Sequence, residues 1–176
     1  TSRTACGVCG LSKRHILNLA AEEGGYDVLV TGHNLDDEAA TLFGNVVNWS
    51  IEYLGRQAPV LPATGDGLVR KVKPLIRVAE RETAAYAVLR GIDYEMEECP
   101  LVAGNSVNRT KAWMSALEHN SPGLKQKFLF GFFDRAAVHF GHDGHPDLRP
   151  CARCGSPTPA DTCAFCRVRR RAAERR

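Results

Sequence analysis

The 176-residue sequence contains no long hydrophobic run and no signal-like start. No window approaches the roughly 18 consecutive apolar residues that a membrane span requires, and the opening residues TSRTACGVCG lack the apolar centre of a secretory signal. Internal repeats and low-complexity tracts are absent as well. We therefore expect a globular, cytoplasmic protein without a membrane partner, whose 44% hydrophobic content is enough for a buried core.

A glycine-rich phosphate-binding loop is also missing. The stretch GHDGH at residues 141–145 has neither a strand pattern before it nor a helix pattern after it, and ATGDG at residues 63–67 lies in a proline-rich stretch. The sequence therefore predicts no loop that binds the pyrophosphate of a nucleotide.

A net positive charge is found only at the C-terminal end. Residues 151–176 hold seven arginines against Asp161 and Glu174, which gives +5, so the net charge of +3 leaves −2 for residues 1–150. Such a local basic segment suits the phosphate backbone of a nucleic acid, although a solvated charge run explains it equally well.

Hydrophobic periodicity predicts that helices and strands alternate. A helix is expected over residues 10–24, and the continuous apolar residues of 26–32 predict a buried strand of a parallel sheet. The next helix is expected to begin near Asn34, with three acids in its first turn. A loop at 57–67, a short strand at 69–72, helices at 80–90, 107–119 and 123–140, and a linker at 141–150 follow.

This order predicts an α/β fold with a parallel sheet, covered by helices, in a first domain over residues 1–145. A second, small domain is expected over residues 146–176. It contains CARCGSPTPADTCAFC, in which two C-x-x-C pairs are separated by eight residues. Such spacing lets two tight turns present four thiolates to one tetrahedral zinc ion, with the ligands Cys151, Cys154, Cys163 and Cys166. Four thiolates close the coordination sphere, so we expect a structural zinc ribbon that presents the basic tail.

Three further cysteines allow several chemistries. Cys6 and Cys9 form another C-x-x-C pair, and Cys99 can join them only in a folded scaffold. A closed zinc site would need His33 as its fourth ligand, a disulfide would leave one thiol over, and an iron–sulfur cluster would accept three cysteines and leave one iron free. Pro100 beside Cys99 slightly favours the cluster.

Other polar residues gather around the predicted strand at 26–32. Lys13 precedes it, while His33 and the acids Asp36, Asp37 and Glu38 follow its carboxyl end. Each has an ordinary structural explanation, because surface lysines are solvated and acids complement a helix N-terminus. Their joint position at the end of a strand, where open α/β sheets bind ligands, nevertheless predicts a functional site.

Five motifs in order carry a resemblance to a known family. They are CGVCGLSKRHILN, TGHNLDDEA, VKPLIRVAERETAAYA, ECP and the closing four-cysteine segment. Together they resemble the TtuA-like tRNA 2-thiolation enzymes of the PP-loop ATP pyrophosphatase family over nearly all of the chain. The resemblance implies part of an adenine-nucleotide alpha-hydrolase-like fold.

The resemblance implies a transferase reaction in tRNA processing. ATP adenylates the C2 oxygen of a tRNA uridine, and sulfur then displaces AMP, so that 2-thiouridine forms. The family implies ATP, magnesium and a 4Fe-4S cluster as cofactors besides zinc. It further implies tRNA and a ubiquitin-like sulfur-carrier protein as partners, with a homodimer as a possible assembly.

Site residues follow from the same resemblance. Cys6, Cys9 and Cys99 match the cluster ligands, Lys13 and Asp37 match catalytic positions, and Gly32 and His33 match the loop that borders ATP. An ammonium near the α-phosphate stabilises charge on the leaving AMP, and a carboxylate takes a proton, orients the base or steers magnesium through water. On the later helix, Arg109 and Lys111 are candidates for contact with the tRNA backbone.

The chain also departs from the family. The Ser-Gly-Gly-x-Asp-Ser PP-loop of the family's N-terminal half is absent, so we expect no adenylation by this chain alone. A zinc-stabilised RNA-binding module without catalysis is the alternative hypothesis. A relative of lysidine synthetase is a third, but that group does not explain the set of three cysteines.

Overall fold

A computed structural model describes residues 4–64, 67–97, 99–102, 106–140 and 147–174. The chain divides into two compact units that are each discontinuous in sequence. Unit 1 comprises Thr1–Leu29, Val60–Val72 and Asp143–Arg176, and unit 2 comprises Val30–Pro59 and Lys73–His142. This grouping differs from the predicted division into residues 1–145 and 146–176, because the cysteine-rich segment shares a unit with the N-terminal helix.

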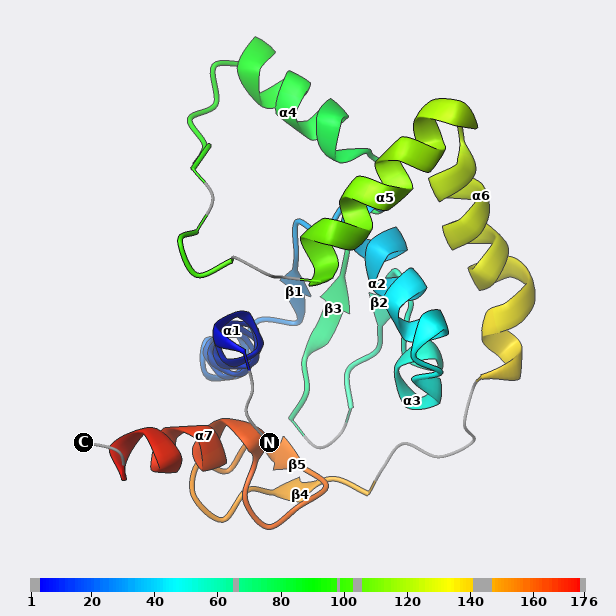
Figure 1. Ribbon diagram of the computed structural model, residues 1–176. Helices are drawn as coiled ribbons and strands as arrows, with labels where there is room; N and C mark the ends of the chain where they lie inside the picture. The colour runs from blue at the N-terminus through cyan, green and yellow to red at the C-terminus, as the bar shows by residue number, and fades with distance from the viewer. Residues whose placement is uncertain (1–3, 65–66, 98, 103–105, 141–146, 175–176) are drawn as a thin grey trace. The chain divides into compact units, whose positions relative to one another are not determined.

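Unit 2 is built around helix α2 (Leu35–Val47), which packs against α5 (Ser106–Asn120) and α6 (Leu124–Gly131) (Figure 1). The core of this unit consists of apolar side chains from these helices and their neighbours: Leu35, Leu42, Leu54, Ile76, Leu129 and Phe132. The predicted start of α2 is confirmed, since Asn34 caps the helix by accepting a hydrogen bond from the Asp37 N–H at 3.0 Å.

Of the remaining helices of unit 2, short α3 (Ile51–Leu54), which packs on α2, was not predicted. Helix α4 (Glu80–Leu89) ends as predicted before Gly91, whose φ of +62° suits glycine. The helix predicted over 123–140 begins as α6 and continues through a π-helical turn (Phe132–Ala136) and a 3-10 turn (Ala137–His139). Its aromatic side chains face the core, as their spacing of four predicted.

Unit 1 contains the long helix α1 (Ala5–Glu23). This helix begins five residues earlier than predicted, because the hydroxyl of Thr4 accepts a hydrogen bond from the Gly7 N–H at 3.2 Å and caps its first turn. The helix includes Gly7 and Gly10 although glycine disfavours helix interiors. Cys6 and Cys9 therefore lie in a helix rather than in a preceding turn.

The sheet corrects two predictions. It consists of β1 (Val28–Val30), β3 (Arg70–Val72) and β2 (Val60–Leu61) in the order β1-β3-β2, and β2 pairs with β3 in antiparallel orientation. The predicted uniformly parallel sheet is wrong for this pair, because a short connection favours an antiparallel partner. β1 lies at the edge, with Val28 38% and Val30 59% exposed in the described structure, so the prediction of a fully buried strand is also wrong.

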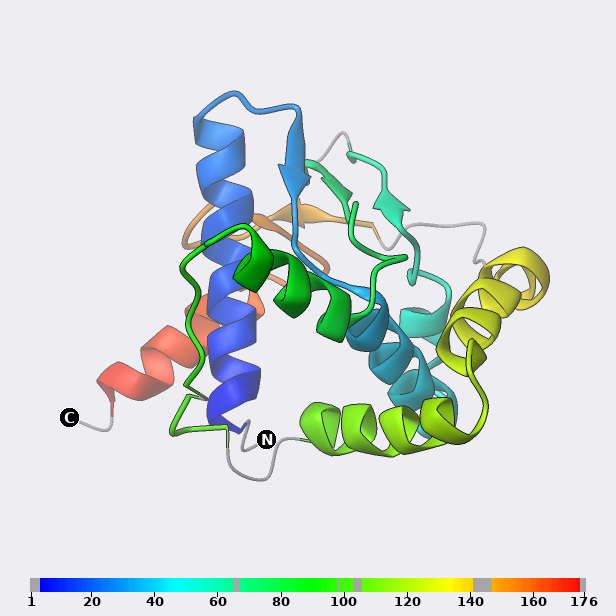
Figure 2. The same cartoon turned by 90° about the horizontal axis from the view of Figure 1, so that it is seen from above.

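The C-terminal part of unit 1 is a small module with two short strands and one helix. β4 (Arg149–Pro150) pairs with β5 (Pro157–Thr158) in antiparallel orientation, and α7 (Ala164–Ala173) follows and packs against α1 (Figure 2). Most of the linker predicted at 141–150 lies outside the described residues. None of the helices that the structure describes is long and apolar enough to cross a membrane.

Candidate functional site

Four cysteines converge in the C-terminal module. The Sγ atoms of Cys151, Cys154, Cys163 and Cys166 all lie within 4.8 Å of one another, and those of Cys154 and Cys163 are 3.7 Å apart. Cys154 is half-buried and the other three are buried. The predicted convergence of the two C-x-x-C pairs is confirmed, and the cluster is consistent with a metal site.

Backbone N–H groups surround these sulfur atoms. The Cys163 and Arg153 N–H groups donate to Cys151 Sγ at 3.2 and 3.4 Å, and the Cys166 N–H donates to Cys163 Sγ at 3.4 Å. Burial opposes ionisation of Cys151, but these backbone donors outweigh it and lower the pKa of its thiol to about 6. Gly155 has a φ of +74°, the conformation that the sequence predicted after the first pair.

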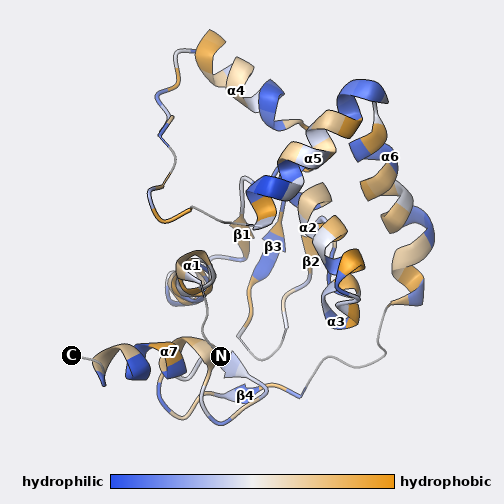
Figure 3. Cartoon of the chain, viewed as in Figure 1, coloured by the Kyte–Doolittle hydropathy of each residue, from blue (hydrophilic) through white to orange (hydrophobic). Residues whose placement is uncertain are grey.

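Helix α7 carries the basic residues away from the four cysteines. Arg167, Arg169, Arg170 and Arg171 are exposed, and Figure 3 shows the hydrophilic residues along this helix in blue. Arg167 also donates from Nη1 to the Thr162 carbonyl at 2.8 Å, which ties the base of α7 to the cysteine-rich loop. A compact cluster thus supports a helix with an exposed row of guanidinium groups.

Helix α1 holds three of the predicted site residues on one face. Cys6, Cys9 and Lys13 are spaced three and four residues apart, so their side chains project from the same side of the helix. Cys9 and Lys13 are exposed, and Cys6 is half-buried. The third cysteine of the predicted set, Cys99, is exposed beside Pro100 in unit 2. The set of Cys6, Cys9 and Cys99 thus draws on both units and stays a prediction.

Each acid in the first turn of α2 contacts a different lysine. The Glu38 carboxylate lies 2.8 Å from Lys73 Nζ, the Asp37 carboxylate lies 2.6 Å from Lys111 Nζ, and Asp36 is hydrogen-bonded to Lys125. The lysines come from the segment after β3, from α5 and from α6. Three separate segments therefore hold this end of the helix by ion pairs. The helix dipole also stabilises the three carboxylates.

Asp36 and Lys125 form the most buried of these pairs. Both side chains are less than a tenth exposed, Ser115 Oγ lies 3.0 Å from Lys125 Nζ, and the Glu80 N–H donates to Asp36 at 2.7 Å. Burial opposes the charge of Asp36, but the hydrogen bonds from Lys125 and the Glu80 backbone outweigh it and lower the pKa of its carboxyl. This pair is a structural feature of the core, because every partner of Asp36 is internal.

Asp37 is the most accessible of the three acids. One oxygen of its carboxylate accepts a hydrogen bond from the Asn34 N–H at 3.1 Å, which completes a capping box, and the other contacts Lys111. Lys111 also contacts Glu80 at 3.0 Å. Burial opposes the charge of Lys111, but the bonds to Asp37 and Glu80 outweigh it and raise the pKa of its ammonium.

The structure therefore gives Lys111 a different place from that predicted. Its ammonium bridges two carboxylates of unit 2, whereas the tRNA-contact hypothesis needs it to face outward. Arg109 is exposed, and its guanidinium carbon lies 5.6 Å from the ring centroid of Trp113. Of the two candidates, Arg109 alone has a side chain that is open to solvent in the described structure.

The segment between β1 and α2 carries Gly32 and His33. Both are exposed, and a ring nitrogen of His33, Nδ1, lies 2.9 Å from the Thr31 hydroxyl. No side chain within 4 Å blocks the space beside Gly32 in the described structure. This open backbone directly before the capped helix is where the sequence places the border of a ligand site.

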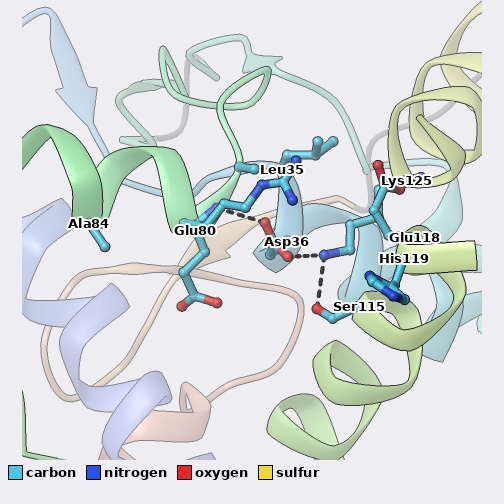
Figure 4. A pocket seen from close by; sticks show the side chains of 10 residues that line it. Leu35, Asp36, Glu80, Ala84, Ser115, Glu118, His119 and Lys125 are labelled. Carbon is cyan, nitrogen blue, oxygen red and sulfur yellow. Dashed lines mark hydrogen bonds and ion pairs between the residues drawn. The ribbon is translucent and has the colours of Figure 1, made fainter. Parts of the chain in front are cut away.

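A cavity of about 440 Å³ opens beside the first turn of α2 (Figure 4). Asp36, Lys125 and Ser115 line it together with residues of α4 and α5. Sequence analysis did not single out Lys125, Ser115 or Lys73. One signal was present, because Lys125 shares a buried stripe with Leu129 of α6 and Phe132 of the following π-helical turn, and a lysine there needs a buried partner.

The chain matches no protein-family model, but it matches curated proteins and a solved structure. It is 47% identical to the tRNA-5-methyluridine(54) 2-sulfurtransferase of Thermus thermophilus over an alignment of 180 residues, which covers 100% of this chain and 56% of the relative. It is 40% identical over 167 residues to the protein of the same name from Pyrococcus horikoshii, with 95% of this chain and 54% of the relative covered.

A solved structure shows the same similarity. The U34-tRNA thiolase NcsA from Methanococcus maripaludis with its [4Fe-4S] cluster matches at a TM-score of 0.75 and 25% identity, with 97% of this chain and 54% of that chain covered. The chain thus spans about half the length of the proteins it matches. The resemblance stated from the motifs is confirmed: over its whole length, this α/β chain is homologous to a portion of the tRNA 2-thiolation enzymes.

Proposed function

We propose that this chain forms part of an ATP-dependent tRNA 2-sulfurtransferase of the cytoplasm. The observation that carries the proposal is the identity of 47% and 40% across nearly the whole chain to two proteins named for that activity. Because both are named for position 54, and the U34 thiolase is only 25% identical, we further propose a uridine at position 54 as the target.

The four C-terminal thiols fit a structural zinc ion. They lie within 4.8 Å of one another, and backbone donors stabilise the thiolate form of Cys151, the form in which a cysteine binds the metal. Zinc would complete the hydrophobic centre of a module too small to fold on apolar contacts alone. The exposed arginines of α7 would then meet tRNA phosphates, to which guanidinium groups bind well.

Cys6, Cys9 and Cys99 would hold the 4Fe-4S cluster. The geometry of α1 supports two of these ligands, because Cys6 and Cys9 share a face one helical turn apart and the Cys9 thiol is accessible. When bound, the cluster supplies a site for sulfur. Lys13, one turn further along the same face, would place its ammonium near the reacting groups.

Residues of unit 2 would serve the nucleotide and the base. Gly32 and His33 form an exposed backbone segment that suits the border of an ATP–magnesium site, and Asp37 presents a carboxylate held by Asn34 and Lys111. That carboxylate would take a proton or orient the uridine while the C2 oxygen attacks the α-phosphate. A sulfur-carrier protein and a homodimer remain proposals from the family resemblance.

Nucleoside mass spectrometry tests the function. We expect tRNA from cells that lack the full-length gene to lose 2-thiouridine, and nuclease mapping to place the loss at position 54. Re-expression should restore it, whereas re-expression of the Cys99→Ser variant should not. An unchanged nucleoside profile would contradict the sulfurtransferase and favour the zinc-stabilised RNA-binding module.

A further inference from the structure

Helix α1 has two opposite faces with different tasks. Cys6, Cys9 and Lys13 follow one another at intervals of three and four residues along one face. His15 and Asn18 are three residues apart on the other. At 3.6 residues per turn, the nine residues from Cys6 to His15 correspond to two and a half turns, so the two faces point in opposite directions.

The second face is anchored at two points within unit 1. Asn18 is buried, donates from Nδ2 to the Gly67 carbonyl at 3.0 Å and accepts from the Val69 N–H at 3.2 Å. One turn earlier, the ring of His15 stacks on the ring of Phe165, with centroids 4.2 Å apart and an interplanar angle of 18°. The helix is therefore held by the β2–β3 connection and by the cysteine-rich module.

Phe165 belongs to the four-cysteine cluster. It lies in the first turn of α7, between Cys163 and Cys166, and packs against the buried cysteines, so its ring position depends on how this turn is held by the cluster. A loop of this size with four convergent thiols acquires its fold with its metal. A metal that orders the cysteines consequently orders the ring that contacts α1.

We infer that the His15–Phe165 stack is a positioning contact through which the metal-loaded C-terminal module fixes the rotation of α1. Fixing the anchored face also fixes the direction of the opposite face with Cys6, Cys9 and Lys13. The relevance of that direction to sulfur transfer rests on the proposed function, but the contact itself does not. His15 and Phe165 are positioning residues, since neither lies on the face that would touch the reacting groups.

Hydrogen exchange tests the inference in the full chain, with zinc(II) as the probe and without tRNA, ATP or iron. An aromatic stack contributes roughly a 2- to 12-fold factor to an opening equilibrium, so zinc should slow exchange of the α1 amides by about that factor. In Phe165→Ala the zinc effect on α1 should disappear while zinc still binds at one ion per chain. His15→Phe keeps two stacked rings and should keep the effect.

Controls separate this contact from a general loss of stability. Phe130→Ala removes an aromatic ring from unit 2 and should leave the zinc response of α1 unchanged. If Phe165→Ala fails to retain zinc, His15→Ala removes the same stack from the side of α1. This variant should bind zinc without the slowing of α1 amide exchange. The inference is overturned if α1 exchanges equally fast with and without zinc, or if His15→Ala and Phe165→Ala both respond like the unchanged protein. An unchanged 2-thiouridine content in cells that lack the full-length gene, together with an intact zinc response of α1, would overturn the proposed function alone.

Discussion

The four-cysteine cluster and the predicted set of three cysteines differ in how they draw on the chain. The C-terminal cluster comes from a segment of sixteen residues, Cys151 to Cys166, whose turns and backbone donors bring the four sulfur atoms together within one module. The proposed second set would combine two cysteines of α1 in unit 1 with Cys99 of unit 2, ninety residues beyond Cys9. Local chain geometry is sufficient for the first set, whereas the proposed second set would require both units.

The same difference appears among the polar contacts of unit 2. Asp37 and Asn34 form their capping box within one turn of helix, but Asp36 meets Lys125 across 89 residues of sequence. Contacts between sequence neighbours form with little loss of chain entropy, while distant partners depend on the whole fold. Variants that remove a local partner and variants that remove a distant partner should therefore differ in their effects on metal binding and on the stability of each unit.

The largest effect is expected from the local cysteine set. Cys163→Ser should abolish tight zinc binding and unfold the module, because metal binding contributes on the order of 10 kcal/mol to the folding of such sites. Zinc stoichiometry and amide exchange of residues 147–174 measure this. Cys99→Ser is the matched control and should retain one zinc ion. Retention of zinc with unchanged affinity by Cys163→Ser would show that the four thiols are not the ligands.

Variants of the three-cysteine set should lose iron but keep zinc. After anaerobic reconstitution, Cys9→Ser and Cys99→Ser should each bind far less iron than the unchanged chain, because in the proposed cluster site each unit contributes ligands. Iron and zinc contents, measured together with the visible absorption spectrum, report the two sites separately. Equal iron binding by all variants would mean that these cysteines do not form a cluster.

Breaking the buried distant pair should cost stability. Lys125→Met leaves Asp36 as an uncompensated buried charge, and we expect the free energy of unfolding in urea to fall by about 3–5 kcal/mol. The double variant Asp36→Leu/Lys125→Met should recover most of this loss, because it removes both charges. A double variant as unstable as the single one would show that packing, not charge, dominates.

The lowered pKa of the Asp36 carboxyl also predicts that the free energy of unfolding falls at acidic pH. Its pKa is lowered from the usual 3.8 in the folded protein, so its stabilisation is fully present above the unfolded value. That contribution is lost as the pH falls below about 4 through the lower folded pKa. Urea unfolding of the unchanged chain and of the double variant between pH 6 and pH 3, roughly the range over which such a carboxyl titrates, should show a steeper loss in the unchanged chain.

The smallest effect is expected for the half-buried bridge. Lys111→Met should lower the free energy of unfolding by only about 0.5–1 kcal/mol, because its partners are partly exposed and salt screens them. Its raised pKa means that the stabilisation is present below about 10.5 and lost as the pH rises through the folded value. Lys127→Met, an exposed lysine on α6, is the control. A loss as large as that of Lys125→Met would contradict this ranking.

Sequence patterns predicted much of the local structure. The start of α2, the end of α4, the aromatic stripe after Gly123 and the convergence of four cysteines all follow from capping, glycine conformation and helical spacing. The start of α1 was wrong, because a threonine cap and favourable contacts overrode the low helix propensity of two glycines.

The same sequence patterns did not predict how the strands pair or how far β1 is buried. The sequence placed β1 and β3 correctly but missed β2, whose two residues lie in a predicted loop. A short apolar run cannot specify its neighbours in a sheet, so neither the edge position of β1 nor the antiparallel β2–β3 pair could be predicted.

By itself, the amino-acid sequence determined helices α2, α4, α5 and α6, the four-cysteine cluster and the kinship with tRNA 2-thiolation enzymes. Spacing along the chain directly sets which neighbours share a turn or a helix face. Only the tertiary structure decided which lysine meets which acid and which ring stacks on α1. These partners lie tens of residues apart, and only packing of whole elements brings such side chains together.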